Sequence, residues 1–517
     1  MQKKTSIKWT VAGLMLGLLL AALDQTIIAT AMPTIVGEMG GMEQFIWVFS
    51  AYMIASVAAM PIFGKLSDMY GRKLFFLSGL IVFMLGSALC GTAETMLQLI
   101  IFRAIQGIGG GALLPITFTI IFDIFPPEKR AKTQGLFGAV FGLSSVLGPI
   151  AGAFFTDYLH WNWIFYINLP LGVIAFVLLY FFYFETLERK RQRIDWTGTL
   201  VLTAMILSLM FALEMGGKEY AWLSGPIIGL FALFAALFIV FLAVERRAAD
   251  PVVPLALFRN PLFTASMVIC FSYGALGISG ASYIPMFVQG VFGGSATEAG
   301  TIMTPMMLCV TLSSAMGSML LARMSYRGVL LISASLILVS VVLLGMLDVH
   351  SPRWAVTLYM MLLGAGIGIN FPVISLTAQH KVEFRQRGSV NSMVTSFRTI
   401  GSAIGVTLFG SLQASQLQQL LSGVVQDPAV TERFKDPQTL LQPEVRTQIP
   451  QEMLQGMISA LADSIGYIFQ WSLVFVALSF VFILMMGKAR MELNAAGKPG
   501  ASKQVQGAAP ESGGVHI

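Results

Sequence analysis

Two charged side chains interrupt long apolar stretches and are the first candidates for chemistry. Asp24, followed by Gln25, and Arg103, with Gln106 one helical turn further on, lie inside runs of mainly apolar residues. An ionised carboxylate inside a membrane span costs several kcal/mol unless it is paired, hydrated or protonated, so Asp24 is a natural proton carrier. Arginine does not lose its charge, so Arg103 must meet a carboxylate, carbonyl groups or water. A purely structural role in helix packing is the alternative for both residues.

A second set of charges lies at the ends of apolar runs. The segment 64–73 combines small, acidic and basic residues, namely Gly64, Asp68, Gly71 and Arg72. Asp123 ends a later run. A charge at the end of a membrane span costs little free energy, and a role in membrane topology alone would explain the lysines of the segment. Glycine allows close approach of the loop to a neighbouring element.

A third group consists of helix-bending and small residues. It comprises Gly142, Gly148, Pro149 and Gly152. Such residues remove side chains from one helix face and allow a bend or a close neighbour. Weaker candidates of mixed type are Pro115, Asn370, Arg398 and Gln289.

The composition indicates which elements must position these residues. Of the 517 residues, 56% are apolar and 11% are charged, and the mean hydropathy is +0.77. A soluble protein could not cover that much apolar surface, so the chain is predicted to be an integral membrane protein. About 20 apolar residues span a bilayer as a helix, and we identify fourteen such runs. They lie near 11–32, 46–66, 74–93, 97–122, 133–157, 163–184, 197–215, 222–243, 262–289, 298–321, 328–347, 354–377, 390–412 and 463–487.

Basic residues indicate how these runs are oriented. Lysines and arginines concentrate in alternate loops, such as 65–73 and 189–193, and at both ends of the chain. Because cytoplasmic loops carry the basic excess, both termini are predicted to be cytoplasmic. The formal charge of +6 therefore indicates membrane topology in preference to nucleic-acid binding. The stretch 415–462 is predicted to be a polar, partly helical outer loop, and the tail 491–517 is predicted to be disordered.

An internal repeat suggests two halves. Gly107 and Gly109 precede Pro115, and Gly364 and Gly366 precede Pro372 at the same spacing. Two parallel repeats are the layout of a rocking transporter whose site lies between the halves, although matched small residues alone could reflect ordinary helix packing. Two halves of six runs each account for twelve of the fourteen. We interpret the remaining pair, 197–215 and 222–243, as an inserted hairpin outside the substrate path. The predicted units are 1–190, 191–258 and 259–490.

Four motifs in order resemble the major facilitator superfamily, and specifically its fourteen-helix drug:proton antiporter family. They are the segments 23–33, 64–73, 103–107 and 148–152. The resemblance implies an all-α membrane fold with two six-helix bundles and an inserted two-helix hairpin. It also implies protonation or cation binding at Asp24, and a charge cluster of Asp68, Arg72 and Asp123 that latches the halves together in the outward-open state. Ala153 replaces a glycine of the antiporter motif, which weakens that part of the match.

These observations predict a proton-coupled antiporter of the cytoplasmic membrane that exports amphipathic, cationic or aromatic compounds by alternating access. Its expected partners are protons, small amphipathic substrates and the lipid bilayer, and it is expected to function as a monomer. Export of one dedicated compound, such as a peptide, amino acid, siderophore or antibiotic, is an open alternative, as is a receptor or scaffold without transport. The histidines have no metal-like or nucleophile–base spacing, so neither an enzyme nor a cofactor, metal or nucleic-acid partner is expected.

Overall fold

The computed structural model describes most of the chain. The described residues are 5–39, 44–125, 136, 140, 143–144, 147–148, 150–152, 154–156, 158–185, 195–217, 219–248, 251–294, 296–380, 382, 386–424 and 451–490. Helices dominate these residues. In order they are α1 (Ile7–Met39), α2 (Phe45–Tyr70), α3 (Arg72–Gly91), α4 (Met96–Ile124), α6 (Trp163–Tyr166), α7 (Asn168–Phe182), α8 (Trp196–Met215), α9 (Gly225–Glu245), the short η2 (Leu255–Arg259), α10 (Pro261–Gly290), α11 (Ala296–Leu321), α12 (Tyr326–Leu344), α13 (Arg353–Ala378), α14 (Arg387–Val424) and α17 (Gln451–Met485).

Local sequence explains where several helices begin. Their first turns are capped by side chains that accept a hydrogen bond from a backbone N–H group. The caps are Thr95 for α4, Asp195 for α8, Asn260 for α10 and Ser325 for α12. Such caps satisfy donors that the helix itself leaves open. Between the caps, the apolar runs continue the helices until the next polar segment.

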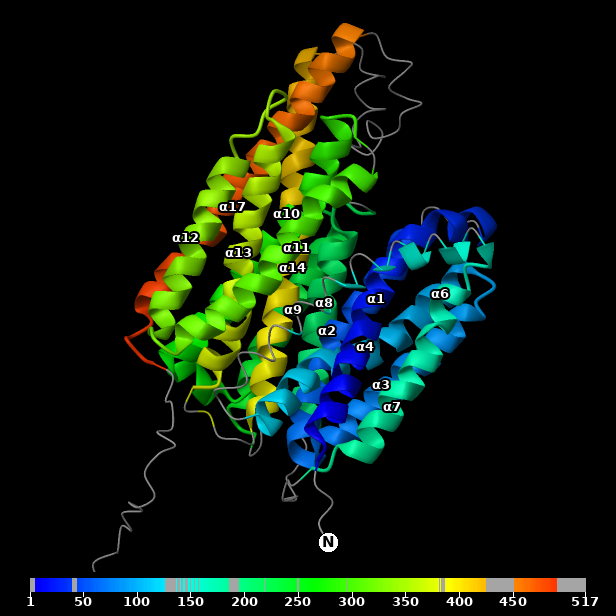
Figure 1. Ribbon diagram of the computed structural model, residues 1–517, viewed down its shortest axis with the longest axis vertical. Coiled ribbons are helices and arrows are strands. Elements are labelled where there is room, and N and C mark those ends of the chain that lie inside the picture. Colours follow the sequence, from blue (N-terminus) through cyan, green and yellow to red (C-terminus); the bar gives the residue numbers. More distant parts are fainter. Residues whose placement is uncertain are drawn as a thin grey trace, which may run out of the picture.

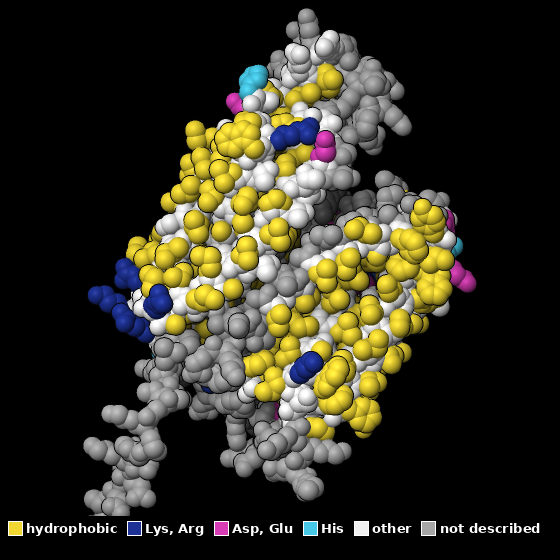
Figure 2. Space-filling view, viewed as in Figure 1, with side chains coloured by type: hydrophobic (Ala, Val, Ile, Leu, Met, Phe, Trp, Pro, Cys, Tyr) yellow, Lys and Arg dark blue, Asp and Glu magenta, His cyan; other side chains and the backbone are white. Residues whose placement is uncertain are grey.

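The helices form a membrane protein. Within the described part of the chain, twelve helices are long and apolar enough to cross a membrane, and apolar side chains are spread over the visible face of the described helices (Figure 2). The chain is thus an all-α membrane protein. The run expected near 390–412 is also helical, as part of α14, but its many polar residues keep it out of the twelve. The run expected near 133–157 lies largely outside the described residues.

Two groups of helices lie side by side (Figure 1). We call α1 to α7 the N half and α10 to α17 the C half. In the N half, α4 packs against α2 and α3, while in the C half α13 packs against α11 and α12. The halves meet where α14 packs against α2 and α4. The groups separate toward the top of Figure 1, so the contact between them lies toward one end of the molecule.

The repeated glycines have matching positions in the two halves. A side chain at Gly107 would clash with the backbone of Tyr52 on α2, and one at Gly109 would clash with the backbone of Phe83 on α3. The first glycine of each pair therefore brings one neighbouring helix close, and the second brings another.

The C half uses the same arrangement. A side chain at Gly364 would clash with the backbone of Met306 on α11, and one at Gly366 with Ile337 on α12. This matched packing is what a parallel repeat predicts, because small residues let helix backbones approach closely.

The stretch 415–462 is partly helical, as predicted. Its first part continues α14 to Val424, and its last part, from Gln451, belongs to α17. Leu417, Leu421 and Met457 are buried in these extensions. The helices therefore continue beyond the apolar runs because an apolar stripe, not a uniformly apolar segment, is enough to pack them. The predicted tail from 491 lies outside the described residues.

Candidate functional site

Asp24 and Arg103 form a buried ion pair in the N half. Asp24 lies on α1 and Arg103 on α4, and each side chain is 1% exposed. Arg103 Nη1 donates to Asp24 Oδ2 at 2.5 Å. The other carboxylate oxygen, Oδ1, accepts from Gln106 Nε2 at 2.8 Å and from Asn168 Nδ2 at 3.3 Å. Both oxygens of the carboxylate thus have donors, which is how a charge is accommodated away from water.

The guanidinium has acceptors besides Asp24. Arg103 Nη1 also donates to Gln106 Oε1 at 2.8 Å, and its Nε donates to the carbonyl oxygen of Val48 at 3.2 Å. The guanidinium carbon lies 4.3 Å from the ring centre of Tyr52, in a cation–π contact. Arg103 is therefore held by three groups that do not depend on the charge of Asp24.

Four helices build this site, which we call the N-half polar cluster: Asp24, Tyr52, Arg103, Gln106 and Asn168. The sequence prediction identified Asp24, Arg103 and Gln106 and the structure brings these together. It missed Asn168 and Tyr52. A lone amide inside an apolar run was a usable signal for Asn168, whereas a tyrosine in such a run carries none. Gln25, predicted beside Asp24, is exposed and lies beside Tyr52.

The predicted charge cluster lies where the two halves meet. Asp68 on α2 accepts hydrogen bonds from the first turn of α14: its Oδ1 accepts from the backbone nitrogen of Gly388 at 2.9 Å, and its Oδ2 accepts from that of Ser389 at 2.7 Å. Ser389 Oγ adds a third bond at 3.1 Å. A carboxylate at a helix N-terminus satisfies open donors and complements the helix dipole. Asp68 thus ties the N half to the C half.

Arg72 completes this contact, as predicted from the loop motif. Its guanidinium lies 3.5 Å from Asp68 and forms an ion pair with Asp123 at the end of α4. Gly64 lies against α14, because a side chain there would clash with Ser392.

The turn that precedes Arg72 is glycine-dependent. Gly71 has a φ of 112°, a region that favours glycine. A side chain there would also crowd the carboxylate of Glu185, which accepts from the backbone nitrogen of Arg72 at 2.8 Å. We call Asp68, Arg72 and Asp123, with the first turn of α14, the cytoplasmic latch, after its predicted side of the membrane.

The antiporter motif is only partly described. Gly148 lies against α1, because a side chain there would clash with Thr26, two residues after Asp24. Thr26 Oγ1 also donates to the carbonyl oxygen of Ser144 at 3.0 Å. Gly152 is buried in a helical segment. Gly142 and Pro149 lie outside the described residues.

The weaker candidates do not join the N-half polar cluster. Pro115 lies inside α4. Asn370 on α13 lies beside Tyr273. Arg398 on α14 lies 4.7 Å from the ring centre of Phe371.

Gln289 also lies outside the N-half polar cluster. Gln289 on α10 donates to the carbonyl oxygen of Pro285 at 3.3 Å, a contact within its own helix. Among the described residues, no group of three or more His, Cys, Asp or Glu side chains is placed to hold a metal ion.

Comparison with known proteins assigns the family. The family model described as Major Facilitator Superfamily matches residues 14–406. The chain belongs to the major facilitator superfamily. It is therefore a membrane transporter and not an enzyme. This membership confirms the resemblance carried by the four sequence motifs.

Two relatives from Bacillus subtilis (strain 168) within the superfamily cover almost the whole chain. Multidrug resistance protein 3 is 48% identical over 499 residues, which cover 95% of this chain and 98% of that protein. The multidrug transporter protein MdtP is 37% identical over 503 residues, which cover 92% of each.

Solved structures of the superfamily share the fold. The human organic anion transporter MFSD10 (TETRAN) superposes with a TM-score of 0.58 at 15% identity, over 91% of this chain and 99% of that one. A bacterial homologue of the human lysosomal transporter Spinster, inward-facing and occupied, has a TM-score of 0.56 at 16% identity, over 92% and 96% of the chains. At these identities the likeness concerns the fold alone.

Proposed function

We propose that this protein is a proton-coupled antiporter that exports amphipathic, cationic or aromatic compounds across the cytoplasmic membrane by alternating access. The observation that carries the proposal is the ion pair between Asp24 and Arg103, buried at 1% exposure inside a transporter. Relatives named multidrug resistance protein and multidrug transporter support the substrate class.

The cluster is suited to bind and release one proton. With Asp24 ionised, Arg103 donates to its Oδ2, and Gln106 and Asn168 donate to its Oδ1. A proton on Asp24 would remove the charge that holds Arg103. The guanidinium would then keep Gln106 Oε1, the Val48 carbonyl and the Tyr52 ring as partners. Both protonation states of Asp24 thus leave Arg103 satisfied, which a reversible carrier requires.

The latch supplies the conformational part of the cycle. Asp68 holds the first turn of α14, and Arg72 bridges Asp68 and Asp123. In the proposed orientation, with fourteen spans and both termini cytoplasmic, this contact closes the inner side and leaves the halves apart on the outer side. Export requires the contact to open so that the substrate enters from the cytoplasm. The protein is proposed to do this as a monomer, since both halves of the site belong to one chain.

The membrane potential can drive this exchange. Moving one net charge inward yields about 2.3 kcal/mol per 100 mV. Exchange of one proton against a neutral compound, or of two protons against a monovalent cation, would draw on this energy.

Substrate-dependent proton release tests the proposal. Purified protein is reconstituted in liposomes loaded with a pH-sensitive dye, and an organic cation such as tetraphenylphosphonium is added. We expect proton movement opposite to the cation in the wild type and none in Asp24→Asn, because the amide keeps the shape and loses titration. The matched control is Glu298→Gln, which removes an exposed carboxylate paired with Arg353. Proton movement of wild-type size in Asp24→Asn would refute the role of Asp24.

A further inference from the structure

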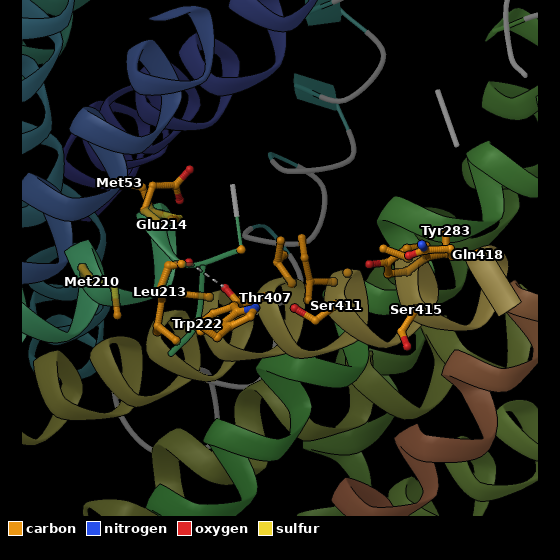
Figure 3. A pocket seen from close by; sticks show the side chains of 18 residues that line it. Met53, Met210, Leu213, Glu214, Trp222, Tyr283, Thr407, Ser411, Ser415 and Gln418 are labelled. Carbon is orange, nitrogen blue, oxygen red and sulfur yellow. Dashed lines mark hydrogen bonds between the residues drawn. The ribbon is translucent and has the colours of Figure 1, made fainter. Parts of the chain in front are cut away.

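A cavity of about 580 Å³ lies beside α8, the first helix of the predicted inserted hairpin (Figure 3). Its walls come from α2, α8, α10 and α14, and from the turn that follows α8. A volume of this size is typical of sites for drug-sized molecules. None of the residues that line it belongs to α1, α4 or α7, which carry most of the N-half polar cluster.

The lining combines an acid with aromatic and sulfur-containing side chains. Glu214 of α8 contributes the carboxylate, and Trp222 and Tyr283 contribute aromatic rings. Met53 and Met210 add polarisable, adaptable surface. In Figure 3, Glu214 lies beside Met53 at one end of the cavity, and Tyr283 lies at the other end. Aromatic faces and a carboxylate attract a cation, while methionine adapts to varied apolar shapes.

The hairpin that forms one wall contacts both halves of the transporter. On the N-half side, Trp47 Nε1 of α2 donates to Glu219 Oε1 at 2.6 Å, and the rings of Trp47 and Phe211 lie 5.8 Å apart. On the C-half side, Thr407 Oγ1 of α14 donates to the carbonyl oxygen of Leu213 at 3.4 Å. Because α2 and α14 belong to different halves, rocking of the halves must change the distance between the cavity walls. A ligand in this cavity is therefore sensitive to the conformational state.

We propose that this cavity is a second ligand site, walled on one side by α8 and the turn that follows it, for a monovalent organic cation with an aromatic or aliphatic body whose charge faces Glu214. The site lies to the side of the interface between the halves. The choice of ligand rests in part on the proposed export of amphipathic cations, whereas the existence of the site rests on the cavity and its lining. The expectation that the hairpin lies outside the substrate path stays a prediction, because this second site lies to the side of that interface.

Site-specific labelling tests occupancy without depending on transport. Cys90 and Cys270 are buried, so replacing Cys309 by serine and introducing Ser411→Cys places one reactive thiol at the cavity wall (Figure 3). The purified full-length protein in detergent is treated with a polar maleimide, with and without tetraphenylphosphonium. We expect the cation to slow labelling of the introduced cysteine, and neutral triphenylphosphine oxide to give no comparable protection.

Two variants test whether the cation needs the carboxylate of Glu214 and whether it occupies the cavity. Adding Glu214→Gln should raise the tetraphenylphosphonium concentration for half-protection about tenfold, because a counter-charge at the site is removed. Glu298→Gln, which removes the carboxylate paired with Arg353 on another surface, should leave that concentration unchanged. In a protein with native serine at position 411, Ala414→Phe should fill the cavity and abolish quenching of Trp222 fluorescence by the cation, measured as the difference from the same protein with Trp222→Phe.

Different failures point to different conclusions. If the cation protects equally well in Glu214→Gln and in the wild type, or not at all, the cavity is not a cation site, even where liposome transport of the same cation is intact. If protection follows the proposal while substrate-driven proton movement is absent, the cavity proposal stands and the antiport proposal falls.

Aminophospholipids offer the same chemistry of a cation on an apolar body. If phosphatidylethanolamine nanodiscs abolish protection that phosphatidylglycerol nanodiscs retain, the site belongs to a lipid and the proposal of a small-molecule site is overturned.

Discussion

The N half and the C half share a packing scheme and differ in the chemistry at its centre. In the N half the inner polar residues include an ion pair, with Arg103 and Asp24 at 2.5 Å. In the C half, Tyr273 and Ser333 are neutral groups joined by a hydrogen bond of 3.0 Å, and Ser333 donates to the carbonyl oxygen of Gly366 at 2.7 Å. Helix packing is thus repeated, while the ion pair is not. The comparison teaches that a repeated scaffold can carry an acid–base pair in one half only.

The two arginines inside the helices show the same contrast. Arg103 has a carboxylate partner, carbonyl and amide acceptors and the ring of Tyr52. Arg398 lies over the ring of Phe371, and no carboxylate of the described residues forms an ion pair with it. Both arginines keep their charge. Of the two, Arg103 alone is paired with a carboxylate, so only its ion pair would change if that acid were protonated.

The largest difference between the halves should follow from removing these arginines. We expect Arg103→Met to cost about 3–5 kcal/mol of stability, because it leaves Asp24 as a buried carboxyl without its charge partner. Arg398→Met should cost about 0.5–2 kcal/mol, the range of a cation–π contact. Thermal unfolding of both variants in the same detergent measures the difference. Equal losses would mean that Arg398 has an ionic role that the comparison does not assign to it.

Glycine substitutions should instead show that the halves are alike. Gly107→Ala and Gly364→Ala each introduce a methyl group against a backbone of a neighbouring helix, and each should destabilise the protein by about 1–3 kcal/mol. The control is Gly229→Ala on α9, which meets nothing within 4 Å and should be neutral or slightly stabilising. If only one of the two substitutions lowered the unfolding temperature of the protein, the result would contradict the matched packing.

Asparagines on the two sides should differ in transport more than in stability. Asn168 donates to Asp24 and to Ser87 Oγ at 3.0 Å, whereas Asn370 lies beside neutral groups. We expect Asn168→Leu to cost about 1–2 kcal/mol at the N-half polar cluster, because it removes a donor from Asp24 Oδ1, and to slow substrate-driven proton movement severalfold. Asn370→Leu should leave that rate close to the wild-type rate, as measured in liposomes.

The contact between the halves should give the smallest effect on stability. Asp68→Asn removes the charge that meets the first turn of α14 and Arg72. Because the amide oxygen still accepts a hydrogen bond and Arg72 keeps Asp123 as its ionic partner, we expect a cost of about 1 kcal/mol. In a transporter whose states differ by a few kcal/mol, this changes their populations severalfold. Accessibility of single cysteines on the inner side should rise while affinity for the substrate stays within about twofold of the wild type. A loss of affinity without a change in accessibility would indicate substrate contact at Asp68.

Much of this protein follows from its sequence because the membrane makes the local signal strong. A helix in a bilayer satisfies its own backbone, so an apolar run of sufficient length specifies a helix by itself. Asp24 and Arg103 stand out for the same reason, since each charge is costly where it lies. The matching glycine spacing ahead of Pro115 and Pro372 likewise indicates a helix contact that is repeated in the two halves.

Only the tertiary structure decides which of these residues meet. Asn168 reaches Asp24 across 144 positions of the chain, and Asp68 caps α14 across 320. These contacts depend on how helix faces fit together, and no local pattern encodes that fit. The same limit explains the hairpin: its apolar sequence specifies two membrane helices, but the cavity beside Glu214 exists because α8 packs between α2 and α14 without filling the space between them.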